Sequence, residues 1–429
     1  MSFDAAAPGI SREKMVSRYR QVRAFTERLC EPLEPEDYVI QTMADASPTK
    51  WHLAHTSWFF ETFILGPGSN GYRPVEPRYG YLFNSYYNGA GPMHCRDRRG
   101  LLSRPTVRET FHYREAIDRA MLALIENAPV DQWRKLMPIV VLGLNHEQQH
   151  QELLLTDIKH AFAQNPLCPV YRTDVMSSTA ESPALRWLDY AEGVYRIGAE
   201  DEGFAFDNER PRHRVFIPEF QLASRPSTNG EYLEFVEDGG YRRPDLWLSE
   251  GWSAVNANQW TAPLYWEKRD GRWFSFTLAG LQTVQANEPV CHLSYFEADA
   301  FARWSGALLP TEAQWEIASA DLTLEGNFAE DGNFQPRACA RPARRAEPEQ
   351  MFGDVWEWTS SSYSPYPGYR PLAGALGEYN GKFMCNQYVL RGGSCATPRS
   401  HIRRSYRNFF PPDKRWQFSG VRLAGSHDT

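Results

Sequence analysis

The sequence has no long run of basic residues, and its formal net charge is -7 at pH 7. This balance argues against nucleic acid as a partner, because nucleic-acid binding proteins cluster Lys and Arg. The first residues contain no sustained apolar stretch, so we expect neither a signal peptide nor a membrane anchor. The seven cysteines include no CxxC pair, which indicates reduced thiols rather than a disulfide framework. We therefore expect a cytoplasmic protein without a nucleic-acid or membrane partner.

The chain of 429 residues also contains no internal repeat and no low-complexity tract. Its length predicts two domains, each large enough for its own core. Helical spacing dominates to about residue 165, whereas in the second half aromatic residues alternate with Gly, Pro, Asn and Arg. That alternation is typical of a loop-rich fold held together by aromatic packing.

Several segments of the first part have the apolar content and spacing of helices. They are 10–30, 51–65, 106–127 and 138–164. The letters SPT at 47–49 predict a helix start, with Ser47 as the cap and Pro48 at the first helical position. Four helices with one long connection predict a bundle, and the inner faces of bundles commonly hold metal sites.

The long connection at 66–105 is rich in Gly, Tyr and Arg. Its aromatic content argues against disorder, so we expect an ordered loop that lines a site. The segment 166–185 is the best candidate for a linker. Beyond it, short apolar runs at 193–197 and 213–217 predict strands. Helices are expected at 295–305 and from Thr311 onward.

The most informative motif is HEQQH at 146–150, which sets two imidazoles one helical turn apart. Residues at i and i+4 share a helix face, so both rings can bind one metal ion. The same letters match H-E-x-x-H, the zinc-peptidase signature, in which the Glu is the general base. Two exposed histidines on a Gln-rich helix are the plain alternative. The pair therefore indicates a metal without naming the chemistry.

A third ligand can come from WHLAH at 51–55, because this segment lies on the second predicted helix. In a bundle either His52 or His55 can face His146 and His150, and the residues favour His55. A zinc peptidase would need a further ligand downstream, and no Gly-x-x-His follows His150. The peptidase interpretation therefore loses ground.

These motifs resemble the ergothioneine-biosynthesis sulfoxide synthases, which are non-haem iron enzymes. In the first part the resemblance rests on SPTKWHLAH at 47–55 and HEQQHQE at 146–152. In the second part it rests on LLPTEAQWE at 308–316, GDVWEW at 353–358, LRGGS at 390–394 and FSGVRL at 418–423. The resemblance implies an α+β protein with a DinB-like four-helix bundle at 1–165, a linker at 166–185 and a formylglycine-generating-enzyme-like, C-type-lectin-like domain at 186–429.

The resemblance further implies an Fe(II) site formed by His55, His146 and His150. The implied reaction uses O2 to join hercynine (trimethylhistidine) to a thiol, cysteine or γ-glutamylcysteine, as a sulfoxide. Three neutral donors leave the charge of the ion uncompensated, which favours capture of a thiolate as a further ligand. The formylglycine-generating chemistry itself is not expected, because Cys385 and Cys395 lie outside the cysteine motif which that chemistry needs.

The resemblance also assigns substrate contacts. The residues implied for hercynine are Trp51, Gln149, Tyr379 and Asn408, and those for the carboxylate of the thiol substrate are Arg96 and Arg99. Trp51 precedes His55 by one turn, where its ring can meet a quaternary ammonium group, although a core role is equally compatible with its position. Arg98 and Arg104 lie close enough in the sequence to replace either arginine, and a solvated arginine run is the plain alternative.

Two positions depart from the members that use γ-glutamylcysteine. Leu376 stands where those members have a catalytic tyrosine, and Phe410 stands where they have an acidic residue. Both differences resemble the cysteine-using branch, in which a Tyr-Tyr pair in the long loop replaces the missing tyrosine. Tyr86 and Tyr87 fit that pair, and either can donate a proton or hydrogen atom that steers the reaction towards the sulfoxide.

Three rival interpretations stay open from the sequence. One is a sister sulfoxide synthase that acts on histidine in ovothiol synthesis, although no fused methyltransferase domain is visible. The second is a zinc-dependent hydrolase or thiol transferase of the DinB type. The third is a non-catalytic protein that binds a ligand through its lectin-like domain.

Overall fold

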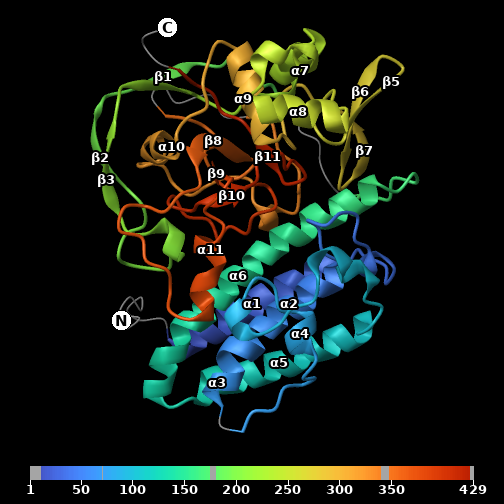
Figure 1. The fold of residues 1–429 in the computed structure, drawn as a ribbon, viewed down its shortest axis with the longest axis vertical. Helices are drawn as coiled ribbons and strands as arrows, with labels where there is room; N and C mark the ends of the chain where they lie inside the picture. The colour runs from blue at the N-terminus through green and yellow to red at the C-terminus, as the bar shows by residue number, and fades with distance from the viewer. Residues whose placement is uncertain (1–10, 70, 174–179, 340–346, 426–429) are drawn as a thin grey trace. The chain divides into compact units, whose positions relative to one another are not determined.

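The computed structural model describes residues 11–69, 71–173, 180–339 and 347–425, and these form two compact units (Figure 1). Unit 1 comprises Met1–Gln164, Glu200–Asp207 and Arg370–Lys382, and unit 2 comprises the remainder. The sequence placed 200–207 and 370–382 in the second domain, whereas in the structure both segments pack with the first. Residues 174–179 of the predicted linker lie outside the described residues.

Unit 1 is built on long helices, which agrees with the predicted bundle. Their bounds are α1 Arg12–Cys30, α2 Thr49–Phe60, α5 Val107–Asn127 and α6 Val130–Ala163. A π-helical turn, η2 (Glu61–Leu65), continues α2 directly. Helix α2 packs against both α5 and α6, and α1 packs against the same two helices. Figure 1 shows these helices side by side.

Helix α6 begins at Val130, earlier than the predicted start at residue 138. Pro138 therefore lies inside the helix, where it removes one backbone hydrogen bond. The turns before it are held by Trp133 and Leu136, which are buried in the core of the bundle. Apolar packing thus extends the helix across a residue that would otherwise mark its start.

The predicted cap of α2 is wrong. Pro48 occupies the N-cap position of this helix, and no side chain caps it. The polar groups of Ser47 bind elsewhere: its backbone N–H donates to Asp157 Oδ2 at 2.8 Å, and its Oγ accepts from Arg99 Nη1 at 2.9 Å. The polar groups of Ser47 are therefore engaged by a buried carboxylate and a buried guanidinium, both distant in sequence, and do not cap the helix.

A cluster of buried charges ties the helices of unit 1 together. Glu147 of α6 has no exposed surface and accepts hydrogen bonds from Arg114 of α5 at 2.5 Å and from Arg23 of α1 at 3.0 Å. Thr26 of α1 donates a third bond at 2.7 Å. Burial alone would raise the pKa of Glu147, but the two guanidinium groups outweigh it and lower this pKa to about 2. The carboxylate is therefore ionised and fixes the rotation of α6 against its neighbours.

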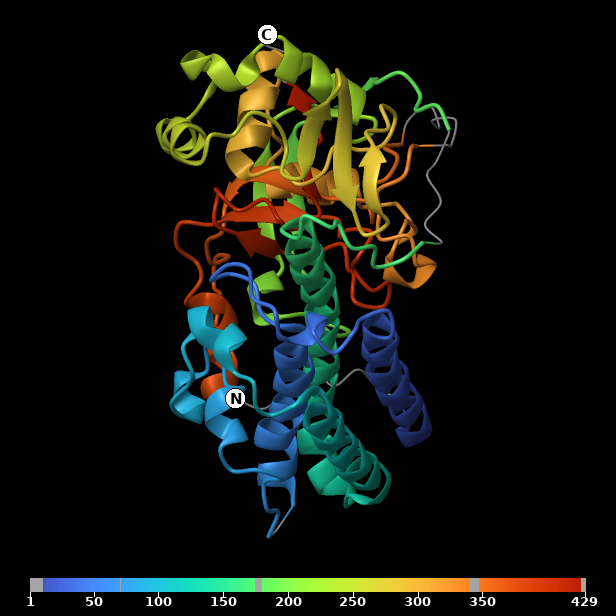
Figure 2. The same cartoon turned by 90° about the vertical axis from the view of Figure 1, so that its right-hand side faces the viewer.

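The long connection at 66–105 is ordered over its described residues, as predicted. It contains short helical turns, with the bounds α3 Gly66–Gly68, α4 Tyr79–Leu82, η3 Asn88–Ala90 and η4 Arg96–Leu101. The segment 370–382 adds η9 (Ala375–Gly377) and α11 (Glu378–Gly381). The carboxylate of Glu378 accepts from the backbone N–H groups of Asn88 at 2.9 Å and Gly89 at 2.7 Å. Figure 2 shows this orange segment beside the light-blue loop.

Unit 2 is a mixed, loop-rich unit, in agreement with the sequence. Its strands are β1 Trp187–Tyr190, β2 Gly193–Ile197, β3 His213–Ile217, β4 Phe220–Ala223, β5 Trp266–Arg269, β6 Arg272–Thr277, β7 Gly280–Thr283, β8 Trp356–Ser362, β9 Tyr388–Arg391, β10 Asn408–Phe410, β11 Ser419–Gly420 and β12 Ala424–Gly425. Its longer helices are α7 Asn229–Glu237, α8 Ser249–Asn258, α9 Tyr295–Trp304 and α10 Glu312–Ala318.

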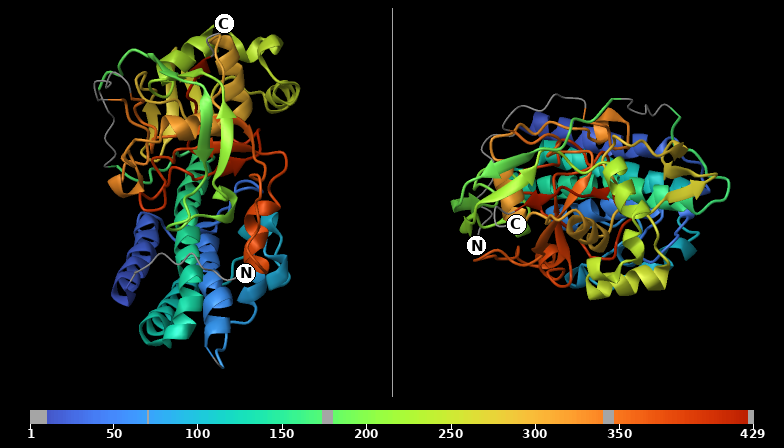
Figure 3. Two further views of the ribbon diagram at one scale, coloured as in Figure 1. Left: turned by 90° about the vertical axis from the view of Figure 1, so that its left-hand side faces the viewer. Right: turned by 90° about the horizontal axis from the view of Figure 1, so that it is seen from above.

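The strands of unit 2 form several small sheets. The largest has the order β10-β9-β8-β11, in which only the β8–β11 pair is parallel. The sheet β1-β4-β12 and the meander β5-β6-β7 are separate from it. The predicted strands β2 and β3 are confirmed and pair as an antiparallel ribbon, which is green in Figure 3. The helix predicted at 295–305 is also confirmed, as α9.

The motifs of the second half meet in the core of unit 2. Glu357 accepts a bond from the indole N–H of Trp315 at 2.7 Å and a bidentate pair from Arg422, whose two nitrogens lie 2.8–3.0 Å from its carboxylate. Arg391 donates to Glu316 through one terminal nitrogen, and all of these side chains are buried. The motif residues therefore serve the fold, because buried charges need partners of this quality.

The charge cluster around Glu147 gives a testable stability prediction. Glu147→Gln leaves Arg23 and Arg114 buried without their anion, so we expect a loss of about 3–5 kcal/mol at neutral pH. In the native protein the pKa falls from 4.5 to about 2, so the stabilisation is complete above about pH 4.5 and is lost as the pH falls towards 2. Urea unfolding followed by circular dichroism measures both effects.

The matched control is Glu115→Gln, because Glu115 forms an exposed pair with Arg119 on α5. This variant should unfold like the wild type at every pH, since exposed pairs contribute little. The stability of Glu147→Gln should depend less on pH between 4.5 and 2 than that of the wild type. A curve for Glu147→Gln that superimposes on the wild type would contradict the assignment.

Candidate metal centre

Three histidines converge between α2 and α6, as the sequence predicted. His55, His146 and His150 offer ligand nitrogens that all lie within 4.8 Å of one another. Their ring centroids are 4.6–4.9 Å apart. The i, i+4 spacing on α6 places His146 and His150 on one face, and His55 meets them from the facing helix.

Burial keeps these imidazoles neutral. It lowers the pKa of His146 to about 4 and the pKa of His150 and His55 well below the usual range, with the neighbouring histidines adding to the effect at the last two. A neutral imidazole has a free lone pair, which is the form that binds a metal ion. The cluster is therefore ready to bind a cation near neutral pH without first losing protons.

The orientation of His55 shows which of its nitrogens faces the cluster. Its Nδ1 donates to the backbone carbonyl of Phe83 at 2.6 Å, so Nε2 carries the lone pair. That Nε2 lies 3.2 Å from Nε2 of His146. A metal ion bonded to two nitrogens at roughly 2.1 Å and roughly 90–110° holds them about 3.0–3.4 Å apart. The spacing of the two nitrogens fits a shared metal ion.

His52 is not part of the cluster and lies between His150 and Asp157. Its Nδ1 lies 2.9 Å from Nδ1 of His150, and its Nε2 lies 3.1 Å from Asp157 Oδ2. His52 and Asp157 are both buried. The structure thus supports the choice of His55 over His52 and gives His52 a contact behind the cluster.

Glu147 cannot act as the general base of a zinc peptidase. One residue along a helix turns the side chain by about 100°, so Glu147 points away from the face that carries His146 and His150. Its carboxylate is enclosed by the buried arginines of the bundle. The H-E-x-x-H match is therefore a coincidence of letters, and the peptidase alternative is wrong on this point.

Trp51 stands directly beside the cluster. Its ring stacks on His55 with the centroids 4.5 Å apart, and Arg99 Cζ lies 3.4 Å from its centroid. Two groups this close cannot share one face of an indole, so His55 and Arg99 cover opposite faces. The indole N–H donates to the carbonyl of Leu82 at 3.2 Å. In this arrangement the cation over Trp51 is Arg99, and a ligand ammonium group would have to approach the ring edge or displace that side chain.

Arg99 is a buried cation without a carboxylate partner among the described residues. It is 4% exposed, and its terminal nitrogens donate to the hydroxyls of Ser47 and Ser85 at 2.9 Å each. Its Nε has no partner in the described part of the chain. Burial, with the charge of Arg96 adding to it, lowers the pKa of Arg99 to about 8. Such a group is suited to pair with an anionic ligand.

The other loop arginines differ in exposure. Arg96 is half-buried, lies over the ring of Tyr86 at 5.4 Å and donates to the carbonyl of Asp45. Arg98 and Arg104 are exposed, which agrees with the plain interpretation of a solvated run. Arg96 and Arg99 are therefore less exposed than Arg98 and Arg104.

The predicted tyrosines meet the segment 370–382. Tyr379 lies 6.4 Å from both Tyr86 and Tyr87 between ring centroids, and its ring is nearly parallel to that of Tyr87. Tyr87 is buried, and burial raises the pKa of its phenol. Tyr86 has a φ of 65°, a left-handed conformation that is strained for this residue type. Leu376 packs against the apolar core of the bundle close to these rings.

The remaining predicted residues divide between the units. Gln149 is half-buried on α6, next to His150. Asn408 and Phe410 belong to β10 of unit 2, where the side-chain oxygen of Asn408 accepts from the N–H of Phe409 at 3.0 Å. All other predicted site residues belong to unit 1.

Sequence reasoning missed the residues that contact His52, His55 and Arg99. Asp157, Phe83 and Ser85 contribute a carboxylate, a carbonyl and a hydroxyl, and none of them stands in a motif. One signal for Asp157 was available in the sequence. Asp157 follows His150 by seven residues, or about two helical turns, and therefore lies near the same face of α6.

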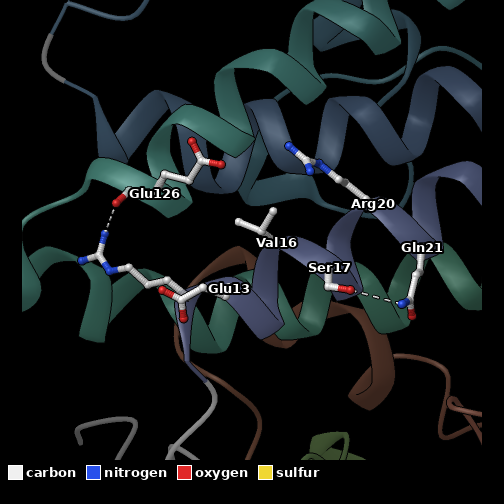
Figure 4. Close-up of a pocket in the computed structure, with 7 residues that line it drawn as sticks. Glu13, Val16, Ser17, Arg20, Gln21 and Glu126 are labelled. Atoms are coloured by element: carbon white, nitrogen blue, oxygen red, sulfur yellow. Dashed lines mark hydrogen bonds between the residues drawn. The ribbon is translucent and has the colours of Figure 1, made fainter.

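Other features of the molecule do not add to this site. A hollow along α1, lined by Arg12, Glu13, Val16, Ser17, Arg20, Gln21 and Glu126, carries exposed mixed charges and none of the predicted residues (Figure 4). Within the described residues, no helix is both long and apolar enough to span a membrane.

Comparison with known proteins agrees with this division of the chain. Residues 18–154 match the DinB superfamily, and residues 176–347 and 346–427 match the Sulfatase-modifying factor enzyme 1-like domain. The formylglycine-generating enzyme of Streptomyces coelicolor is 28% identical over 55% of this chain and 88% of that protein.

Two further relatives extend over both parts. The hercynine oxygenase of Mycobacterium tuberculosis is 33% identical over 96% of this chain and 99% of that protein. The hercynine oxygenase of Mycolicibacterium smegmatis is 32% identical over 97% of this chain and 99% of that protein. Because the identity extends across nearly the whole of both sequences, the chain belongs to the hercynine oxygenase family.

Proposed function

We propose that this protein is an iron(II)- and O2-dependent sulfoxide synthase of ergothioneine biosynthesis, which joins hercynine to cysteine. The observation that carries the proposal is the set of three neutral histidines, two buried and one half-buried, whose ligand nitrogens lie within 4.8 Å of one another. His55, His146 and His150 would hold the ion. Iron(II) would supply the redox chemistry that couples O2 to oxidation of the substrates, a role for which zinc is unsuited.

The proposed reaction balances without another reductant. Hercynine loses the hydrogen of one ring carbon, and the thiol loses its S–H hydrogen as the carbon–sulfur bond forms. One atom of O2 becomes the sulfoxide oxygen, and the other leaves as water with those two hydrogens. The two oxidations, C–S coupling and S-oxygenation, together supply the four electrons that reduce O2.

We assign the carboxylate of the thiol substrate to Arg99, with Arg96 as its neighbour. Arg99 is buried, lacks a carboxylate partner in the described residues and lies against Trp51, which stacks on His55. A substrate carboxylate would give this cation the partner that its buried position requires. It would also bring the thiol to the edge of the histidine cluster, so that the reacting groups meet in a fixed orientation.

For hercynine we retain Trp51, Gln149, Tyr379 and Asn408 as proposed contacts. Gln149 is adjacent to His150 in the chain, and Tyr379 packs beside the tyrosine pair. Because Arg99 covers the face of Trp51 opposite His55, the trimethylammonium group would meet the edge of this ring.

Tyr86 or Tyr87 is proposed as the donor that steers the outcome towards the sulfoxide. Tyr87 packs against Phe59 and Trp58, with centroids 6.3 and 5.8 Å apart, and those rings in turn contact His146 and His55. The raised pKa of Tyr87 keeps it a neutral phenol, the form that can donate. A cytoplasmic location belongs to the same proposal and is supported by the seven cysteines, none of which forms a disulfide within the described residues.

Oxygen consumption by the Fe(II)-loaded protein tests the proposed function. We expect uptake only when hercynine and cysteine are both present, with a product heavier than hercynine by the cysteinyl group and one oxygen. The Zn(II)-loaded protein and His146→Ala should show no uptake. Uptake with cysteine alone would indicate a thiol dioxygenase, and uptake with histidine in place of hercynine would indicate the ovothiol-type alternative.

Replacement of Arg99 tests the thiol site. Arg99→Met removes a charged hydrogen-bond donor worth about 1.5–3 kcal/mol, so KM for cysteine should rise by about 10- to 100-fold. KM for hercynine should change little. The control is Arg98→Met, one residue away on an exposed position, which should behave like the wild type. Equal KM values for cysteine in all three proteins would remove Arg99 from the site.

The choice of thiol follows from Leu376 and Phe410, which replace the tyrosine and the acidic residue of the γ-glutamylcysteine-using members. We expect kcat/KM to be much higher with cysteine than with γ-glutamylcysteine. Competition between the two thiols, with the products separated by mass, measures this preference directly. The reverse preference would show that neither position decides the thiol.

A further inference from the structure

We propose that Asp157 and His52 set the tautomer of His150, and thereby hold its Nε2 as the nitrogen that faces the metal ion. This inference rests on the proposed role of the three histidines as metal ligands. It concerns two residues behind the cluster, and its physical basis is the direction in which each hydrogen bond must run.

The direction is fixed at Asp157. Its Oδ2 accepts from the backbone N–H of Ser47 at 2.8 Å and faces Nε2 of His52 at 3.1 Å. An ionised carboxylate can only accept hydrogen bonds, so the proton between these two residues belongs to Nε2 of His52.

The tautomer of His52 then decides that of His150. A neutral imidazole with its proton on Nε2 presents a lone pair at Nδ1. Nδ1 of His52 lies 2.9 Å from Nδ1 of His150, so His150 must donate across this contact. With its proton on Nδ1, His150 carries its lone pair on Nε2. The reverse arrangement would place a proton on the nitrogen that has to bind the ion.

The three histidines are therefore supported unequally. His55 is oriented by the carbonyl of Phe83, and His150 by the Asp157–His52 pair. Nδ1 of His146 has no hydrogen-bond partner among the described residues. A carboxylate behind an imidazole raises the basicity of a metal-binding histidine. Since His52 carries this influence, it is a positioning residue and not a ligand.

The sharpest test compares two replacements of His52. In His52→Asn the carboxamide oxygen can still accept from Nδ1–H of His150, whereas His52→Leu removes the acceptor at similar volume. Loss of such a partner typically weakens metal binding about 10- to 100-fold. We expect the dissociation constant for Fe(II) to rise by that factor in His52→Leu and to be largely restored in His52→Asn. Anaerobic competition with a chromophoric chelator measures it, without hercynine, thiol or O2.

The matched control is His112→Leu, because His112 is an exposed residue of α5 and belongs to neither the histidine cluster nor the Asp157–His52–His150 chain. This variant should bind Fe(II) like the wild type. Equal affinity in His52→Leu and the wild type would overturn the proposal, as would equal losses in His52→Leu and His52→Asn.

Nitrogen NMR of the metal-free wild type, labelled with 15N-histidine, tests the tautomers without any substitution. We expect protons on Nε2 of His52 and on Nδ1 of His150. A proton on Nδ1 of His52 or on Nε2 of His150 would overturn the proposal even if every variant failed to fold. Neither measurement depends on turnover, so an inactive protein with the expected tautomers would refute the proposed function alone.

Discussion

The arrangement of unit 1 depends on the burial of one carboxylate, that of Glu147, between two arginines of neighbouring helices. A rotation of α6 would leave a buried charge without its partner, at a cost of several kcal/mol. Adjacent residues on a helix point about 100° apart, so the rotation that satisfies Glu147 also turns His146 and His150 towards α2. The packing of Glu147 thus determines the direction in which the face of α6 with His146 and His150 points.

The long loop between α2 and α5 orients further side chains around the histidine cluster. Within a few residues it supplies a carbonyl to Trp51 from Leu82, a carbonyl to His55 from Phe83 and a hydroxyl to Arg99 from Ser85. Further along, the same loop is held by Glu378 through two backbone N–H groups. The orientation of His55 on α2, one of the proposed metal ligands, therefore depends on a segment more than 300 residues later in the chain, through hydrogen bonds that each need a defined loop conformation.

Local pattern was sufficient for the parts that obey local rules. Spacing predicted the helices of the bundle, the strands β2 and β3 and the convergence of His146 and His150. Each of these features depends on residues that lie close together in the sequence. The local pattern gave a wrong prediction at Ser47. This residue type favours a helix cap, but its backbone N–H and its hydroxyl form hydrogen bonds with Asp157 and Arg99 instead. The local pattern also could not show that 370–382 joins unit 1 or that His52 meets Asp157, because both contacts join residues about a hundred or more positions apart.

The second half of the chain carries several sequence motifs. The structure shows that their residues stabilise the fold, so the motifs say little about the chemistry. The motif residues Trp315, Glu357 and Arg422 hydrogen-bond to one another in the core of unit 2, so their role in this chain is structural. The 28% identity to a formylglycine-generating enzyme is confined to about half of the chain and reports that shared fold. The chemistry has to be argued from unit 1, where three neutral histidines converge and Trp51 lies between His55 and Arg99.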